Sequence, residues 1–203
     1  MNTKQRILDE ALTLFAEKGY ANVYVGQIAE AVGIKAPSLY KHYKSKQDIF
    51  NAILDEMKRR YDAQAGALNM NGNDAAADAQ MFAGISEDEL VKMGIGLFSY
   101  FLHDDYARRF RKMLTIEQFH NPELSQLYTR QYVDGPLSYQ AMMFTMLTSG
   151  GILAGGDVNV MAIQFYAPIY MLLTLCDRHP EREAEAVKLI EQHIRQFNRN
   201  YQV

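Results

Sequence analysis

Two short apolar segments separated by a glycine constrain the fold of this chain more than any other feature. Helical spacing of apolar residues predicts one short helix over residues 25–32 and a second over residues 36–43. Pro37 falls in the first turn of the second helix, where its missing N–H costs nothing. Gly33 lies between the helices and can adopt the positive φ that ends a helix.

The residues around this glycine predict a helix-turn-helix. Ala29 is small enough to let a crossing helix come close. Apolar side chains supply a shared core for the two helices: Ile28, Val32, Ile34 and Leu39. A plain helical hairpin without a binding role is the alternative interpretation, because short helix pairs with a glycine turn also occur for structural reasons alone.

Longer amphipathic helices are predicted on both sides of this pair. Residues 3–18 carry a one-sided apolar stripe, with Asn2 or Thr3 as the N-cap. Ser45 can cap another helix over residues 46–67, which has apolar residues at the same spacing. The short helices are therefore expected to lie between two longer ones.

The remaining residues are predicted to be helical, apart from loops and one connector. Residues 66–84 are rich in Asn, Gly, Ala and Asp without a sustained period, which favours a mobile connector. Ser86 and Glu89 form a capping-box signature. A bend is expected at Gly135-Pro136, because an interior proline removes a backbone hydrogen bond. Helices are expected over residues 86–103, 104–119, 121–149, 157–178 and 180–201.

The absence of strand alternation favours an all-α fold of about nine helices. We expect a helix-turn-helix domain at residues 1–47 and a larger helical domain at residues 48–203. The 203 residues are 48% hydrophobic and 22% charged, which excludes a disordered, collagen-like or disulfide-scaffold chain.

Cysteine content and the apolar stretches bear on where the protein works. The single cysteine, Cys176, allows no internal disulfide and no thiolate zinc cluster, and is expected to be a small buried hydrophobe. The most apolar stretch, residues 165–176, falls short of the roughly 20 residues of a membrane-spanning helix. The N-terminal residues show no export signal. We therefore expect a cytoplasmic protein without a membrane partner.

Charge is unevenly distributed along the chain. The formal net charge is -3, but residues 1–60 hold ten Lys/Arg against seven Asp/Glu, while residues 61–203 hold eleven against seventeen. Basic side chains gather in the first part without an acidic neighbour: Lys35, Lys41, His42, Lys44 and Lys46. Such a patch attracts phosphates, although a charge run alone is more often a solvated face.

Placed on the predicted helix-turn-helix, part of this patch suits nucleic-acid binding. Lys35, Ser38, Lys41 and His42 would lie opposite the shared core and be free to meet phosphates. The N-terminal end of the second helix would then enter the major groove. The spacing thus favours DNA binding over the plain helical hairpin.

A series of short motifs runs in order from Thr3 to Phe50: Phe15-Ala-Glu-Lys-Gly-Tyr20, Ile28-Ala29, Gly33-Ile34, Leu39-Tyr40-Lys41-His42-Tyr43, Ser45-Lys46 and Ile49-Phe50. In these motifs and their spacing the sequence resembles the tetracycline-repressor (TetR) family of transcription regulators. About a quarter of the chain matches motifs that are specific to this family. The remainder matches in length, helix count and all-α character.

The resemblance implies DNA-binding roles for several residues of the helix-turn-helix domain at residues 1–47, which we call the head. Ala36 and Pro37 would face base edges, where they make apolar contact such as with thymine methyls. Tyr40 would contact a base or a phosphate, and Gln27 would either read an adenine edge or be plain surface. Several side chains would hold the DNA backbone: Ser38, Lys41, His42 and Lys46.

The sequence departs from the family pattern at the starts of both short helices. Where the family commonly has Ser or Thr capping the first of them, this chain has Tyr24 and Val25, and Gly26 offers no side chain to a base. Lys35 replaces a usual Ser or Thr cap before the second. The operator sequence therefore cannot be transferred from a relative.

The resemblance also implies that residues 50–203 hold a small-molecule pocket and a dimer interface. Aromatic and methionine side chains are candidates for the pocket, although most are expected to be core: Phe98, Phe101, Met113, Phe119, Tyr132, Tyr139, Met143 and Phe144. Polar side chains that would orient a ligand if they face inward are Arg109, Glu117, His120 and Arg130. A dimeric four-helix bundle would bury Phe165, Ile169, Leu172, Val187, Ile190, Ile194, Phe197 and Tyr201.

The prediction is therefore a homodimeric repressor, without a cofactor, that binds a pseudo-palindromic double-stranded operator and is released by a small molecule. The alternative is a helical metal-dependent enzyme. Glu117 and His120 have the spacing of a di-iron bundle, and His103-Asp104 resembles a phosphohydrolase pair. Neither has the companion ligands that its chemistry needs, so a chance match is the better explanation.

Overall fold

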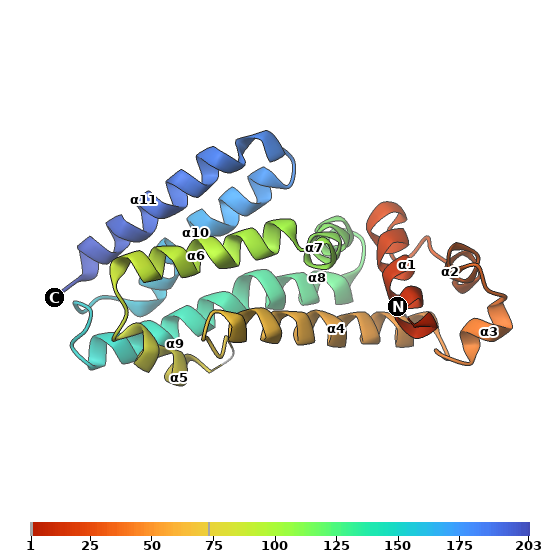
Figure 1. Ribbon diagram of the computed structural model, residues 1–203, viewed down its shortest axis with the longest axis horizontal. Helices are drawn as coiled ribbons and strands as arrows, with labels where there is room; N and C mark the ends of the chain where they lie inside the picture. The colour runs from red at the N-terminus through yellow and green to blue at the C-terminus, as the bar shows by residue number, and fades with distance from the viewer. Residues whose placement is uncertain (1, 73) are drawn as a thin grey trace. The chain divides into compact units, whose positions relative to one another are not determined.

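The computed structural model describes residues 2–72 and 74–203, and in these ranges the regular elements are helices (Figure 1). The all-α prediction is confirmed. The helices are α1 Thr3–Lys18, α2 Val25–Val32, α3 Ala36–Tyr40, α4 Lys46–Ala67, α5 Ala75–Phe82, α6 Glu87–His103, α7 Asp105–Glu117, α8 Pro122–Thr129, α9 Gly135–Ser149, α10 Val158–Cys176 and α11 Glu183–Tyr201. A π-helical turn, Arg130–Asp134, precedes α9, and a 3₁₀ turn, Pro180–Arg182, precedes α11.

The chain forms two compact units. The first contains Met1–Arg60 and Asp105–Tyr128, and the second contains Tyr61–Asp104 and Thr129–Val203. The first unit is therefore larger than the head expected at residues 1–47, because α7 and most of α8 belong to it.

The core of the first unit forms around α1, which packs against α2 and α7. The predicted cap is confirmed: Asn2 Oδ1 accepts a hydrogen bond from the N–H of Gln5 at 2.8 Å. Ser45 caps α4 as expected, since its Oγ accepts from the N–H of Asp48. The apolar stripe of α1 is enclosed: Ile7, Leu8, Ala11, Leu12 and Phe15 are buried.

The second unit has two apolar clusters. One lies between α6, α10 and α11 and contains Phe98, Leu172, Ile190 and Ile194. The other lies between α5, α9, α10 and α11 and contains Ala79, Met143, Phe144, Met161 and Phe197. Helices α10 and α11 contribute to both clusters and lie side by side (Figure 1).

The expectation of a mobile connector over residues 66–84 is wrong, because α5 forms there. Asp74 caps the helix by accepting from the N–H groups of Ala76 and Ala77. The carboxylate of Asp78 is buried and accepts three hydrogen bonds, from the N–H groups of Asn71 and Gly72 and from the Tyr139 hydroxyl. Tertiary hydrogen bonds therefore hold a segment whose apolar pattern is weak.

The single bent helix expected over residues 121–149 is two helices joined by a π-helical turn. The N–H of Gly135 donates to the carbonyl of Arg130, five residues back. A Cβ at Gly135 would lie 2.6 Å from that carbonyl oxygen, so a side chain would clash there. The irregular geometry beside Gly135-Pro136 is therefore a widened π-helical turn that ends at the glycine.

Helix α10 is longer than the apolar stretch considered in the sequence. With 19 residues it is long and apolar enough to cross a membrane by length and composition alone, and 22% of its apolar window is buried. The core helix of a soluble protein can have the same length and composition, so this finding is weak evidence for a membrane.

Candidate nucleic-acid interface and internal pocket

The turn between α2 and α3 has the geometry that the sequence predicts. Gly33 has φ +76° and ends α2 in the left-handed conformation. The N–H of Ile34 donates to the carbonyl of Ala29 at 2.9 Å, and Arg6 Nη2 donates to the carbonyl of Val32 at 2.6 Å. These bonds satisfy C-terminal carbonyls of α2, which fixes the direction in which α3 leaves.

Helix α3 buries one side and exposes the other. Leu39 is fully buried, whereas Tyr40 is 51% exposed. The structure brings most of the predicted DNA-binding residues to this exposed side or its edge: Lys35, Pro37, Lys41 and His42 are exposed, and Ala36 and Ser38 are partly buried. Lys35 is the N-cap residue of α3, and its side chain makes no capping hydrogen bond. This arrangement offers apolar side chains from one short helix and basic side chains from the residues directly before and after it.

Gln27, expected either to read an adenine edge or to be plain surface, uses its amide oxygen within the fold. Its Oε1 accepts a hydrogen bond from the N–H of Tyr24 at 2.8 Å, so the amide side chain caps the start of α2. Reading adenine uses both the oxygen and the nitrogen of a glutamine amide. Tyr24 itself is the N-cap residue of α2 and is 71% exposed.

Lys46 is partly committed to the fold. Its Nζ donates to the carbonyls of Tyr20 and Val23 at 2.8 and 2.9 Å, and lies 4.3 Å from the centre of the Tyr20 ring. Burial lowers the pKa of the Lys46 ammonium, and the carboxylate of Glu117 opposes that shift. Two of its three N–H groups therefore fix the loop between α1 and α2, which leaves one for a phosphate.

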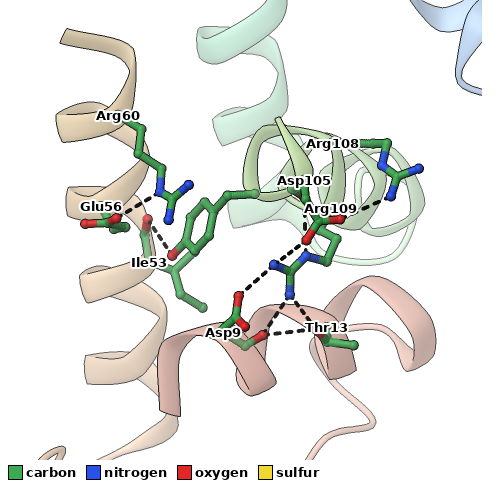
Figure 2. Close-up of polar contacts among 9 residues, drawn as sticks. Asp9, Thr13, Ile53, Glu56, Arg60, Asp105, Arg108 and Arg109 are labelled. Carbon is green, nitrogen blue, oxygen red and sulfur yellow. Dashed lines mark hydrogen bonds and ion pairs between the residues drawn. The ribbon is translucent and has the colours of Figure 1, made fainter. Parts of the chain in front are cut away.

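Arg109 joins α7 to α1 rather than orienting a ligand (Figure 2). Its Nη1 donates to the carbonyl of Asp9 and to Thr13 Oγ1, while Nη2 lies 2.6 Å from Asp9 Oδ1 and 2.7 Å from Asp105 Oδ2. The side chain is 17% exposed, so the contacts are partly shielded from water. We call Asp9, Thr13, Asp105 and Arg109 the Arg109 cluster.

Glu117 provides a second tie within the first unit. Its Oε1 accepts from the N–H of Tyr20 at 2.7 Å, and its side chain is buried. His120 is exposed, and His103 Nε2 lies 2.7 Å from Glu183 Oε1. Within residues 2–72 and 74–203, no group of three or more His, Cys, Asp or Glu side chains could hold a metal ion. The arrangement gives the metal-enzyme alternative no support.

A pocket of about 450 Å³ lies in the second unit, among residues of α5, α6, α9, α10 and α11. Tyr139, Met143 and Phe144 line it, as predicted for a ligand site. Further lining residues outside the predicted set are Met70, Phe82, Ile85, Leu90, Met93, Leu97, Gln140, Leu147 and Phe165. No sequence signal separates these from core residues, since both kinds have helical spacing.

The other five predicted pocket residues lie elsewhere. Met113 is fully buried in the first unit, and Phe119 is 80% exposed. Phe98 and Phe101 belong to the cluster between α6, α10 and α11, and Tyr132 stacks on Tyr170. These five residues do not line this pocket, and their ligand-binding role stays a prediction, because aromatic residues at helical spacing fill the core as readily as a cavity. Arg130 is exposed.

The residues expected at a dimer interface are mostly inside the chain. Ile190 and Ile194 are fully buried, and Leu172 and Phe197 are nearly so. Phe165, Ile169, Val187 and Tyr201 are partly buried and pack against the same two clusters. The narrow stripe of α11 therefore packs against α6 of its own chain, and a dimer interface at these residues stays a prediction.

Helix α10 nevertheless exposes apolar side chains on its other side. Val160 is 47% exposed, Ile163 is 52% exposed and Met171 is 60% exposed, and Ala167 between them is also exposed. Their spacing of three, four and four residues places them on one face. We call this face, Val160–Ile163–Ala167–Met171, the α10 stripe.

A helix-turn-helix whose second helix is flanked by exposed basic residues, in a chain whose other helical unit contains a pocket, is the arrangement typical of DNA-binding regulatory proteins. Residues 7–53 match the family model described as bacterial regulatory proteins, tetR family. This match lies in the N-terminal part of the chain and confirms the resemblance to the tetR family that the sequence shows there.

Similar proteins agree with this assignment. The chain is 40% identical over 67 residues to IcaR, the negative transcriptional regulator of the biofilm operon in Staphylococcus epidermidis. That match covers 29% of this chain and 36% of IcaR, so it spans about a third of the curated relative.

Solved structures match over the whole length. SmeT, the repressor of the Stenotrophomonas maltophilia efflux pump SmeDEF, has a TM-score of 0.65 at 19% identity, covering 100% of this chain and 92% of that one. SmeT has also been solved as a triclosan complex. A TetR-family regulator of Pseudomonas syringae has a TM-score of 0.66 at 17% identity, covering 98% and 96%. At such identities these structures show the shared fold alone.

Proposed function

We propose that this protein is a cytoplasmic, non-enzymatic transcriptional repressor that binds a pseudo-palindromic operator as a homodimer and leaves it when a small molecule occupies its pocket. The observation that carries the proposal is the exposed side of α3, whose apolar side chains are flanked by the exposed basic residues Lys35, Lys41 and His42, while Leu39 on its other side is buried in the core. The names of IcaR and SmeT, a negative regulator and a repressor, support the sign of regulation.

DNA contacts are assigned to the head at residues 1–47. Lys35, Lys41 and His42 are exposed and would hold phosphates, with Ser38 beside them. Pro37 and Ala36 offer apolar contact to base edges, and Tyr40 would contact a base or a phosphate. Lys46 would add one phosphate contact from the N-terminus of α4, where the helix dipole adds to its charge.

The homodimer is assigned to the α10 stripe. Leaving such a face in water is unfavourable at about 25 cal/mol per Å² of apolar surface, and a second copy would cover it. Two-fold symmetry of the dimer would produce two equivalent operator half-sites.

Light scattering of two aspartate variants tests this interface. Ile163→Asp should yield a monomer, because it places a charge in the middle of the α10 stripe. Gln80→Asp, which adds the same charge at an exposed position of α5, is the control and should remain a dimer. A dimer that survives Ile163→Asp with full affinity would refute this interface.

Release requires a ligand that binds the two arrangements of the dimer with different affinity. The pocket of the second unit is the assigned site, because its lining is mainly apolar with a few polar groups. A ligand that fits the pocket only when the spacing of the two heads does not match the operator half-sites would lower the fraction of dimers able to bind the operator.

Selection of bound fragments from randomised duplex DNA tests the proposal directly. We expect a two-fold symmetric motif. Lys41→Gln should weaken binding to all sequences alike and reduce the salt slope by about one unit, whereas Tyr40→Ala should also change the sequence preference. Lys92→Gln, an exposed lysine of α6, is the matched control and should bind like the parent. The absence of any enriched motif at low salt would refute the proposal.

A further inference from the structure

The walls of the pocket in the second unit are predominantly apolar and adaptable. Three methionines, Met70, Met93 and Met143, line it together with aromatic rings from α5, α9, α10 and α11. Methionine side chains are flexible and polarisable and pack well against rings. A volume of about 450 Å³ lies within the range of small-molecule sites. These walls therefore favour a compact ligand with a large apolar surface.

The pocket holds no unpaired charge for an ionic ligand. Among the described residues that line it, Glu87 is the charged one, and none is Lys, Arg or His. Glu87 Oε1 accepts from Arg195 Nη1 at 2.8 Å, and its Oε2 accepts from Asn198 Nδ2 at 3.1 Å. An anion would thus be desolvated without a cationic partner, and a cation would meet a carboxylate already paired with Arg195.

Gln140 supplies the polar feature that points to a specific ligand. It lies on α9 and lines the pocket, and its Oε1 is buried without a hydrogen-bond partner in the part of the chain that the structure describes. The neighbouring Tyr139 is different, because its hydroxyl already donates to Asp78 Oδ2 at 2.5 Å. A buried acceptor without a donor is costly and rare, so a ligand that donates there regains a hydrogen bond.

We infer that the pocket takes an uncharged, mainly apolar ligand that carries a hydroxyl or N–H group donating to Gln140 Oε1. The inference rests on the proposed function in treating this pocket as the effector site. The ring walls orient the apolar part, and the hydrogen bond selects ligands with a donor over otherwise identical ligands without one.

Three small naphthalenes distinguish the required chemistry when their binding to the full chain is measured by calorimetry. 2-Naphthol is neutral and has a donor, 2-methoxynaphthalene is neutral without a donor, and 2-naphthoate is an anion. We expect 2-naphthol to bind about tenfold more tightly than the ether, and the anion to bind most weakly. Equal affinity of 2-naphthol and the ether, tighter binding of the anion, or no binding of 2-naphthol would each overturn the inference.

Gln140→Met keeps a similar side-chain shape and removes the acceptor. It should lower the affinity for 2-naphthol about tenfold and bring it within about threefold of the ether. Gln80→Met is the matched control, because Gln80 is an exposed glutamine of α5 that does not line the pocket. Retention of the parent's preference in Gln140→Met would also overturn the inference. Urea denaturation of both variants shows whether the fold is intact.

Operator binding, measured separately, distinguishes this inference from the proposed function. A protein that binds its selected operator but does not prefer 2-naphthol retains the proposed function and loses the ligand assignment. A protein that prefers 2-naphthol through Gln140, yet shows no DNA binding, retains the ligand chemistry and loses the proposed function.

Discussion

The buried carboxylate of Asp78 provides the sharpest test of how the second unit is held together. Its side chain is 2% exposed, and it accepts from the N–H of Asn71 at 2.6 Å, the N–H of Gly72 at 2.8 Å and the Tyr139 hydroxyl at 2.5 Å. Burial, followed by the hydrogen bond to Asp78, raises the pKa of the Tyr139 phenol. Asp78 thus ties α5 and the segment before it to α9 beside the pocket.

Asp78→Asn preserves size but places an amide NH₂ group where a carboxylate oxygen accepts. At least one buried donor then faces another donor, at a cost of about 1–3 kcal/mol, and the remaining bonds lose their ionic character. We expect a loss of about 3–4 kcal/mol in the free energy of unfolding. Tyr139→Phe removes one of the three bonds and should cost about 1–2 kcal/mol.

Urea denaturation followed by circular dichroism, at one protein concentration, measures these losses. The double variant should be about 1 kcal/mol more stable than the two single losses predict, because the residues share a hydrogen bond. Asp55→Asn, at an exposed aspartate of α4, is the control and should lie within about 0.5 kcal/mol of the parent. A loss below about 1 kcal/mol for Asp78→Asn, or strict additivity with Tyr139→Phe, would refute this account.

Three other predictions concern stability and are measured in the same way. Arg109→Met should lower the free energy of unfolding by about 2 kcal/mol, because it breaks the Arg109 cluster. Arg108→Met, at an exposed arginine of the same helix, should lower it by less than about 0.5 kcal/mol. Equal losses in the two variants would contradict the role of Arg109 in joining α7 to α1. The hydrogen bond from Arg59 lowers the pKa of Glu56, so the stability that the Glu56 carboxylate contributes is present above its unfolded pKa and is lost as pH falls through its folded pKa. Glu56→Gln should therefore be about 0.5–1 kcal/mol less stable than the parent at pH 7 and equally stable at about pH 3. A stability difference that does not change with pH would disprove this. Gly135→Ala should lower the free energy of unfolding by about 1–3 kcal/mol, because the new Cβ would clash with the Arg130 carbonyl. Gly66→Ala in α4 meets no atom within contact distance and should raise the free energy of unfolding by about 0.5–1 kcal/mol. A change of the same sign in both variants would count against this explanation.

The sequence predicts the helices well because caps and apolar spacing are local. The bonds of Asn2, Ser45 and Ser86 to backbone N–H groups lie within three residues, so the pattern and the structure agree. Helix α5 escapes prediction for the opposite reason. Its anchor, Asp78, finds Tyr139 at a separation of 61 residues, and no local pattern reveals such a pairing.

The candidate sites are predicted unevenly, for the same physical reason. An apolar stripe shows which side of a helix is buried, but not which helix covers it, so the pattern of Ile190 and Ile194 suggests a second copy although both residues meet α6. Lys46 shows the same limit for a charge. The sequence shows a lysine at the start of a helix, but not that its ammonium donates hydrogen bonds to the carbonyls of Tyr20 and Val23 in an earlier loop.

The first unit is assembled from two stretches of chain, and this governs how heads can be exchanged between regulators. Asp9 and Arg109 are paired across 100 residues of sequence, and Glu117 holds the N–H of Tyr20 across 97. A chimera that receives only residues 1–47 of another protein would inherit α1 without the α7 surface that fits it. Functional grafts should therefore carry both stretches, and in natural variants substitutions at Asp9 and Arg109 should be inherited as a pair.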